Sequence, residues 1–172
     1  SSHDGDDPSS VAIIDPCHVF SETYQEARHK FRTAAQQAGA TLHALPVAIP
    51  DHVSSPTDDD NGVKQDYTID IAVLYGSGPG LTVHTSGVHG VEGYAGSSIQ
   101  IAFLESVYPT VKKRESELPT VILVHAVNPY GMAHYRRTNE NNVDLNRNGL
   151  HADEWNHIMM ETSQTERKSG LY

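Results

Sequence analysis

Two stretches of the chain carry apolar residues at helical spacing. Between Ser21 and Ala38 the apolar positions lie three and four residues apart, with Ser21 placed to cap the helix and Gly39 placed to end it. A second stripe runs from Tyr94 to Val107, and Pro109 is expected to end it. The sequence therefore predicts two amphipathic helices.

Four other stretches have the patterns of strands: Thr41 to Ile49, Tyr67 to Tyr75, Leu81 to Thr85, and Thr120 to Ala126. The last of these, TVILVHA, is an almost unbroken β-branched and apolar run, which is typical of a strand buried on both faces. Residues 51–66 form an acidic, turn-rich loop. Because doubly buried strands lie in the middle of a sheet, the predicted class is α/β.

Composition indicates one globular domain and excludes some partners. Of 172 residues, 37% are hydrophobic and 20% charged, which is ordinary for a domain with a core. The formal net charge of -10 gives no electrostatic basis for binding a nucleic acid backbone or an anionic membrane. No apolar run approaches the ~20 residues that cross a bilayer. We therefore expect no nucleic acid and no membrane partner.

The start of the chain and its cysteine content bear on domain limits and compartment. Residues 1–10, SSHDGDDPSS, are polar and lack an initiator methionine, so residues 1–18 are predicted to be a flexible segment preceding a domain at residues 19–172. The single cysteine, Cys17, is predicted to be a buried, inert thiol. One cysteine and no leader favour the cytoplasm.

The stretch SGVHGVEG places His89 and Glu92 three residues apart among glycines. With 11 His and 10 Glu, roughly half a match to this spacing arises by chance, and His151 and Glu154 form a second copy in a polar, helix-starting stretch. The first copy, however, lies between a predicted buried strand and the next helix, where open α/β sheets bind ligands. Imidazole and carboxylate suit zinc, but a plain strand-to-helix turn explains the same residues.

Three later motifs accompany the first: NPYG at residues 128–131, RRTN at 136–139, and DLNRN at 144–148. In this order they resemble the zinc metallocarboxypeptidase superfamily, which includes carboxypeptidase A-like peptidases and the succinylglutamate desuccinylase and aspartoacylase deacylases. The chain is most similar to a poorly characterised branch, over about Phe20 to Asn148. The resemblance implies a mixed central β-sheet flanked by helices, of which this chain corresponds to the N-terminal half.

Position by position, the resemblance implies that His89 and Glu92 are ligands of Zn2+. Asp144 would hold His89 by its other ring nitrogen, which fixes the tautomer and raises the basicity of the ring. Judged alone, Asp144 is equally well a turn former.

The resemblance also assigns substrate contacts. Asn146 and Arg147 would bind the terminal carboxylate of the substrate, a task that suits the planar fork of arginine. Arg136 or Arg137 would stabilise the oxyanion, and Arg136 is favoured because Tyr135 and Arg136 follow the aromatic-arginine pattern of the family. On their own residues, Asn146 and Arg147 fit an ordinary surface loop as well.

The family also uses a third zinc ligand, a histidine, and a glutamate that acts as general base. Both are expected beyond Tyr172, so the chain is expected to be a truncated piece, inactive alone, with an exposed strand edge and apolar core surface. His125 is the alternative third ligand within the chain, and His84 is expected to be a core or supporting histidine.

These observations lead to one expected function and two alternatives. The expected function is a zinc-dependent hydrolase that cleaves a C-terminal peptide or amide bond next to a free carboxylate, acting on a small peptide. The first alternative is an N-acyl amino acid deacylase of aspartoacylase type, whose substrate is an acylated amino acid. The second is a non-catalytic module that binds a metal or a carboxylate.

Overall fold

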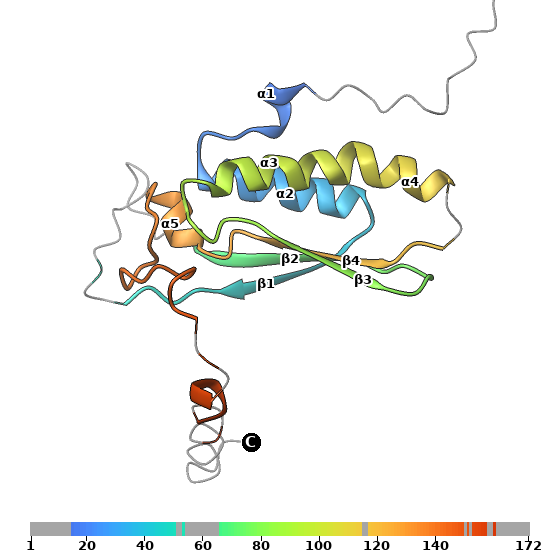
Figure 1. Ribbon diagram of the computed structural model, residues 1–172. Helices are drawn as coiled ribbons and strands as arrows, with labels where there is room; N and C mark the ends of the chain where they lie inside the picture. The colour runs from blue at the N-terminus through green and yellow to red at the C-terminus, as the bar shows by residue number, and fades with distance from the viewer. Residues whose placement is uncertain are drawn as a thin grey trace, which may run out of the picture.

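A layer of helices packs against one face of a four-stranded mixed sheet (Figure 1). The computed structural model describes residues 15–50, 53, 66–114, 117–149, 151, 153–157 and 160. The predicted α/β class with a mixed sheet is confirmed. Residues 1–14 of the predicted flexible segment and most of the predicted acidic loop at 51–66 lie outside these described residues, whereas residues 16–18 belong to the helix Pro16–Val19.

The first long helix begins two residues later than the sequence predicted. Thr23, not Ser21, is its N-cap, because the Thr23 hydroxyl accepts a hydrogen bond from the backbone N–H of Glu26 at 3.2 Å. Gly39, at φ +81°, ends the helix as expected. The helices are α1 (Pro16–Val19), α2 (Tyr24–Gln37), α3 (Gly93–Ala102), the π-helical turn η1 (Phe103–Val107), α4 (Tyr108–Arg114) and α5 (Pro129–Ala133).

The prediction that Pro109 ends the second helix is wrong. The helix continues through α4 to Arg114 after widening into the π-helical turn η1, in which the backbone N–H of Tyr108 bonds to the carbonyl of Phe103. Proline has no N–H and its ring crowds the preceding turn, so one extra residue in that turn lets the helix pass instead of stop.

The sheet has the order β1-β2-β4-β3. β1 (Thr41–Pro46) pairs antiparallel with β2 (Thr68–Leu74), β2 pairs antiparallel with β4 (Thr120–His125), and β4 pairs parallel with β3 (Leu81–Thr85). The strand predicted from Thr41 to Ile49 therefore ends at Pro46. β4 lies between two neighbours, whereas β3 is an edge strand.

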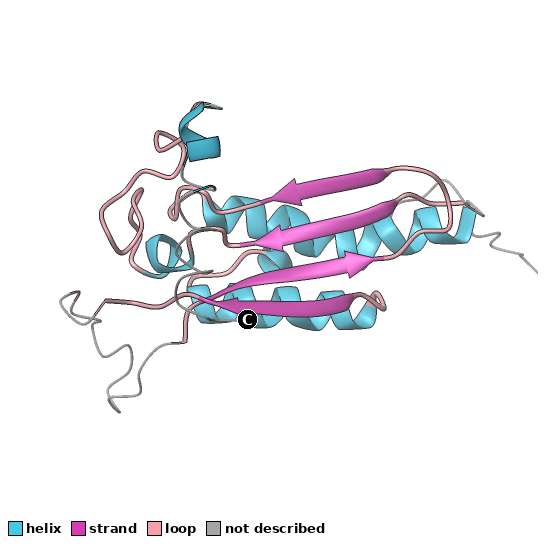
Figure 2. Cartoon of the chain, turned by 90° about the horizontal axis from the view of Figure 1, so that it is seen from below, coloured by secondary structure: helices cyan, strands magenta, loops and turns pink. Residues whose placement is uncertain are grey.

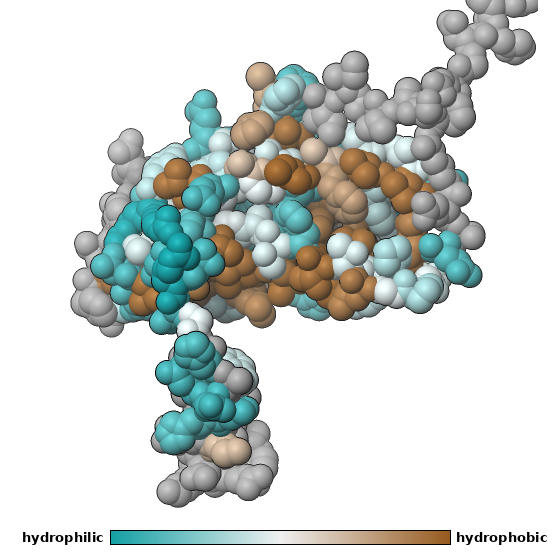
Figure 3. All heavy atoms as spheres, in the orientation of Figure 1, coloured by the Kyte–Doolittle hydropathy of each residue, from teal (hydrophilic) through white to brown (hydrophobic). Residues whose placement is uncertain are grey.

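The two faces of the sheet differ in how they are covered. The helix-facing side forms a core with Phe31, Ile101 and Leu104 from the helices and Ala72, Leu74 and Leu123 from the strands. On the opposite side, Leu45 is 51% exposed and Val83 is 54% exposed. Figure 2 shows the strands unobstructed from below, and Figure 3 shows hydrophobic residues at the surface along the sheet.

Three burial predictions are therefore wrong. β4 is covered on one face only, β3 is exposed at all five residues, and Cys17 is exposed. Within the described residues no element covers the second face of the sheet or pairs with the outer edge of β3. Cys17 lies on a single turn of helix whose only buried residue is Val19. Across the described part of the chain, no helix has the length and apolar character needed to span a membrane.

Candidate metal-binding site

The segments after β3 and β4 lie side by side because these two strands are parallel and end at the same edge of the sheet. Pairing continues past both strand ends through three backbone hydrogen bonds: Ser86 N to Val124 O at 3.0 Å, Val127 N to Ser86 O at 2.9 Å and Asn128 N to Gly87 O at 2.8 Å. The predicted histidine segment and the NPYG segment are thus neighbours.

Two glycines allow the histidine segment to follow this path. Gly87 has φ +69°, a conformation that side chains other than glycine adopt rarely. A Cβ on Gly90 would overlap the backbone of Gly131 in α5. The backbone N–H of Gly90 also donates to the carbonyl of Arg136 at 3.1 Å. Close backbone packing therefore fixes the turn that carries His89.

Both ring nitrogens of His89 face carboxylates. Nε2 lies 2.9 Å from Oδ1 of Asp144, and Nδ1 lies 3.5 Å from Oε2 of Glu92. Asp144 can only accept, so in the neutral ring Nε2 carries the proton and Nδ1 keeps its lone pair on the side of Glu92. The side chain of His89 is only 10% exposed, whereas that of Glu92 is 75% exposed.

Asp144 also binds an arginine. Nε of Arg137 donates to Oδ2 of Asp144 at 2.8 Å, while the backbone N–H of Asn146 donates to Oδ1 at 3.0 Å. The hydrogen bond from Arg137, followed by that from His89, holds the pKa of Asp144 well below its usual value. The carboxylate that orients His89 is therefore ionised and held from two sides.

The donor set suits zinc but is incomplete. Two ligands of a tetrahedral zinc with bonds of about 2.1 Å stand about 3.4 Å apart, close to the 3.5 Å between Nδ1 of His89 and Oε2 of Glu92. No group of three or more His, Cys, Asp or Glu side chains that could hold a metal occurs in the described residues. This part of the chain therefore offers two of the three protein ligands that a catalytic zinc uses.

A cavity of about 360 Å³ adjoins this pair. His89, Glu92 and Asn146 line it, and the rest of its wall is residues 85–88 and Gly96. The cavity thus brings Asn146 of the DLNRN motif to the same wall as His89 and Glu92.

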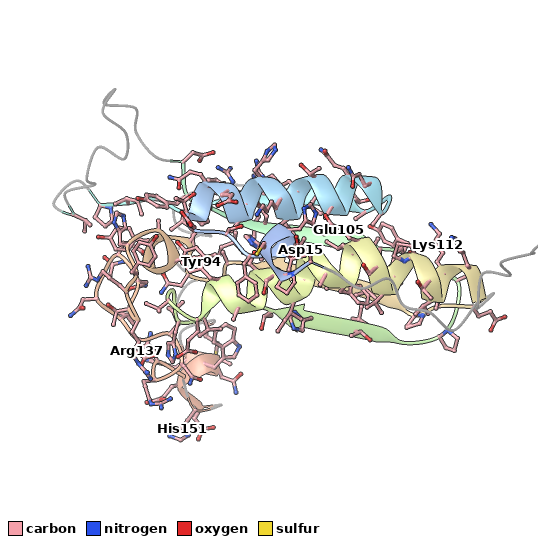
Figure 4. All side chains as sticks on the ribbon, turned by 90° about the horizontal axis from the view of Figure 1, so that it is seen from above. Asp15, Tyr94, Glu105, Lys112, Arg137 and His151 are labelled. Carbon is pink, nitrogen blue, oxygen red and sulfur yellow. The ribbon has the colours of Figure 1, made fainter. Side chains whose placement is uncertain are left out.

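Neither arginine predicted to face the oxyanion lines this cavity. Arg136, the favoured one, donates to Oδ1 of Asn142 at 3.0 Å and has its guanidinium 5.8 Å from the ring centre of Tyr130. Arg137 is bound to Asp144. Figure 4 shows Arg137 and His151 on the loop side of the molecule, away from Glu105 and Lys112 on the helices.

Arg147 is exposed and bonds within its own loop. Its Nη1 donates to the carbonyl of Asn146 at 3.1 Å, and its backbone N–H donates to the carbonyl of Asp144 at 2.9 Å. Arg147 is not among the residues that line the cavity. The DLNRN motif thus contributes one half-buried carboxylate that anchors His89, one cavity-lining residue and one surface guanidinium.

The other histidines singled out by sequence lie away from the cavity. His125 is fully buried, with Nε2 2.9 Å from the hydroxyl of Ser97 and its ring stacked on Phe31, so the structure does not bring it to His89 and Glu92. Burial lowers the pKa of His125 to about 4. The backbone N–H of His151 donates to the carboxylate of Glu154 at 2.8 Å, a helix-start contact, as predicted.

His84 lies on the exposed edge strand, but its Nδ1 is 3.1 Å from the buried amide of Gln100. Gln100 also donates to the carbonyls of His84 and Val124, at 3.2 and 3.1 Å. Sequence patterns gave no role to Gln100 or to the equally buried Asn128, although NPYG directly after a strand was a usable signal for the second.

The fold and this cluster define an α/β protein with a histidine, held by an aspartate, at the shared end of two parallel strands. The chain belongs to the family described as "Protein of unknown function (DUF2817)", whose model matches residues 20–165.

A solved structure of Porphyromonas gingivalis glutaminyl cyclase is similar at 12% identity and a TM-score of 0.34, with 66% of this chain covered. The match spans 48% of that chain, so this chain aligns with less than half of the cyclase. A search of curated proteins found no match.

Proposed function

We propose that this chain forms the zinc-binding part of a hydrolase of carboxypeptidase type, which cleaves a C-terminal peptide or amide bond next to a free carboxylate. The observation that carries the proposal is the position of His89, with Nε2 held by Asp144 and Nδ1 turned toward Glu92. An aspartate that accepts from the distal nitrogen of a histidine is the usual support of a metal ligand.

His89 and Glu92 would hold the zinc, and a third ligand would come from outside the described residues. Bound zinc supplies Lewis-acid chemistry, polarising a carbonyl and lowering the pKa of water. Asp144 keeps the proton of His89 on Nε2, and Arg137 keeps Asp144 in place. Together they present an unprotonated Nδ1.

The polar residues beside the cavity would hold the substrate. Asn146 lines the cavity, and Arg147 follows it on the surface, where its planar guanidinium would bind a free carboxylate through two parallel hydrogen bonds. Arg136 or Arg137 would stabilise the oxyanion. For that task the arginine has to exchange its present partner, Asn142 or Asp144, for the oxygen of the substrate.

Zinc binding by the complete protein, measured by calorimetry, tests the proposal. We expect one zinc per chain, and at least a ~100-fold weaker affinity in His89→Ala, because the ligand set loses its buried imidazole. The second His-x-x-Glu pair supplies a matched control, since His151→Ala should leave the affinity within about twofold. Equal effects of the two substitutions would rule out a metal site at His89.

Turnover then separates the kinds of function. Hydrolysis of peptides with a free C-terminus supports the carboxypeptidase proposal, whereas hydrolysis of N-acyl amino acids supports a deacylase that uses the same residues. A specific observation favours a non-catalytic module as the second candidate: the described residues place only two ligands at the site. Zinc binding without turnover of either substrate class would favour that module.

A further inference from the structure

Asn128 is a buried amide at the junction of three segments. It directly follows the end of β4, is 1% exposed, and caps α5 with its Oδ1, which accepts from the backbone N–H of Gly131 at 2.8 Å. Its Nδ2 lies 3.4 Å from the carbonyl of Val88 and 3.4 Å from the carbonyl of Arg137. The two N–H groups of one amide thus face two different loops.

Those two carbonyls belong to the two segments that meet at the contact between His89 and Asp144. Val88 directly precedes His89, and Arg137 donates to the carboxylate of Asp144 that holds the imidazole. Asn128 therefore connects the segment that carries the ring to the segment that carries its carboxylate partner, although the two lie about 50 positions apart in sequence.

The surrounding backbone confines this amide. A Cβ on Gly131 would overlap the side chain of Asn128, and the backbone N–H of Asn128 donates to the carbonyl of Gly87 at 2.8 Å. A side chain at this position has to supply one acceptor and two donors within the reach of a single methylene, a set that asparagine alone provides.

We propose that Asn128 is a positioning residue of the candidate metal site, which sets the distance between His89 and the Asp144–Arg137 pair and thereby the tautomer of His89. The inference rests on the proposed function where zinc is the probe. The tautomer, in contrast, is measured without metal, so failure of zinc binding leaves the role of Asn128 testable.

The competing explanation is a purely structural one, in which Asn128 only caps α5. Asn128→Asp separates the two, because aspartate keeps the oxygen that accepts from Gly131 but lacks the N–H groups that face Val88 and Arg137. A cap alone tolerates aspartate, whereas a bridge between the two loops does not.

The test compares wild type, Asn128→Asp and a control in the complete protein. The control is Tyr24→Phe, which removes a buried hydroxyl that donates to the carbonyl of Thr68 and accepts from its backbone N–H, both at 3.0 Å, and leaves the amide of Asn128 unchanged. Nitrogen-15 NMR of the His89 ring reports the tautomer, and calorimetry reports the zinc affinity. We expect a single Nε2–H tautomer in wild type and Tyr24→Phe.

In Asn128→Asp we expect a mixture of tautomers and a zinc affinity lower by about 10–100-fold, the usual effect of losing a partner that orients a ligand. A single Nε2–H tautomer together with a zinc affinity within twofold of wild type would overturn the proposal. If Asn128→Asp fails to fold, the side-chain amide of wild-type Asn128 decides. Slow hydrogen exchange at Nδ2 supports the bridge, and exchange at the rate of an exposed amide contradicts it.

Discussion

The candidate site has two halves that differ in how they are held. The inner half consists of His89, Asp144 and Arg137, which bind one another through hydrogen bonds of 2.8 and 2.9 Å. The outer half consists of Glu92, Asn146 and Arg147, which are exposed. The side chains of His89 and Asp144 are 10% and 19% exposed, against 75% for Glu92, whereas Arg137 is 54% exposed and belongs to the inner half through its bond to Asp144.

The difference indicates which part of the site exists before a ligand arrives. The inner half is preorganised, since its geometry follows from backbone packing and charged hydrogen bonds within the fold. The outer half has to be ordered by a ligand or by residues outside the described part, and ordering long side chains costs about 0.5–1.5 kcal/mol each. Substitutions in the inner half should therefore affect stability and metal affinity more strongly.

The largest effect should come from the glycine beneath the inner half. Gly90→Ala places a Cβ into the backbone of Gly131, and because backbone cannot give way cheaply we expect a loss of more than about 4 kcal/mol of unfolding free energy. Gly149 follows the outer half, and a Cβ added there would have no other atom within 4 Å, so Gly149→Ala should change stability by less than about 0.5 kcal/mol. Urea unfolding of both variants measures the contrast, and equal losses would contradict it.

Parts of the fold followed from local pattern, and parts did not. The strand at Leu81–Thr85 was predicted with its observed bounds, because alternation and turn glycines act locally. Its burial was not predicted correctly, since an apolar sequence says that a strand is suited to a core and not which element covers it. The helix continues past Pro109 because the π-helical turn η1 changes its register. The local rule that proline ends a helix does not predict such a turn.

The site shows the same limit. His89 and Asp144 are 55 positions apart, so their contact cannot be derived from spacing and entered only through a family resemblance. The role of Asn128 depends on two carbonyls from separate loops, and no one-dimensional pattern records such a meeting. Residue chemistry indicated candidates, and the parallel pairing of β3 with β4 brought them together.

The next effect concerns His125, which is buried between the sheet and the helices, against Phe31 of α2 and Ser97 of α3. Burial lowers the pKa of His125 to about 4, below its unfolded value of about 6.5, so the unfolded chain binds the extra proton between these values. The contribution of neutral His125 to the free energy of unfolding is therefore complete above pH 6.5. About 3 kcal/mol of this contribution is lost as the pH falls toward 4. Asp70 opposes this shift, whereas Arg28 and Arg32 add to it.

His125→Gln should remove this share of the pH dependence. Unfolding free energies of wild type and variant, measured from pH 7 to pH 4, should converge as the pH falls, because only wild type loses the contribution of a neutral imidazole. Parallel curves for the two proteins would contradict the prediction, because they would mean that His125 has the same pKa in the folded and the unfolded state. At pH 7 zinc affinity should be the same in both, since His125 lies outside the cavity.

A smaller effect concerns the zinc affinity, which should depend more on the inner half of the site than on the outer half. Asp144→Asn keeps the shape of the side chain but weakens its hold on His89 and Arg137, so we expect zinc affinity to fall about 10–100-fold. Asn146→Ala in the outer half truncates a cavity-lining residue that is not a proposed zinc ligand, and it should change the affinity less than about threefold. Calorimetry on both variants measures the ratio, and a larger loss in Asn146→Ala would reverse the comparison.

The smallest effect should follow loss of the surface guanidinium. Arg147 is exposed and, among the described residues, its side chain bonds to a carbonyl of its own loop, so Arg147→Ala should change the unfolding free energy by less than about 0.5 kcal/mol and the zinc affinity by less than about twofold. Urea titration and calorimetry measure both quantities. A loss above about 1 kcal/mol would mean that Arg147 belongs to the folded frame. A null result for stability and zinc, combined with weaker binding of a carboxylate substrate, would instead show that the outer half acts only once a ligand is bound.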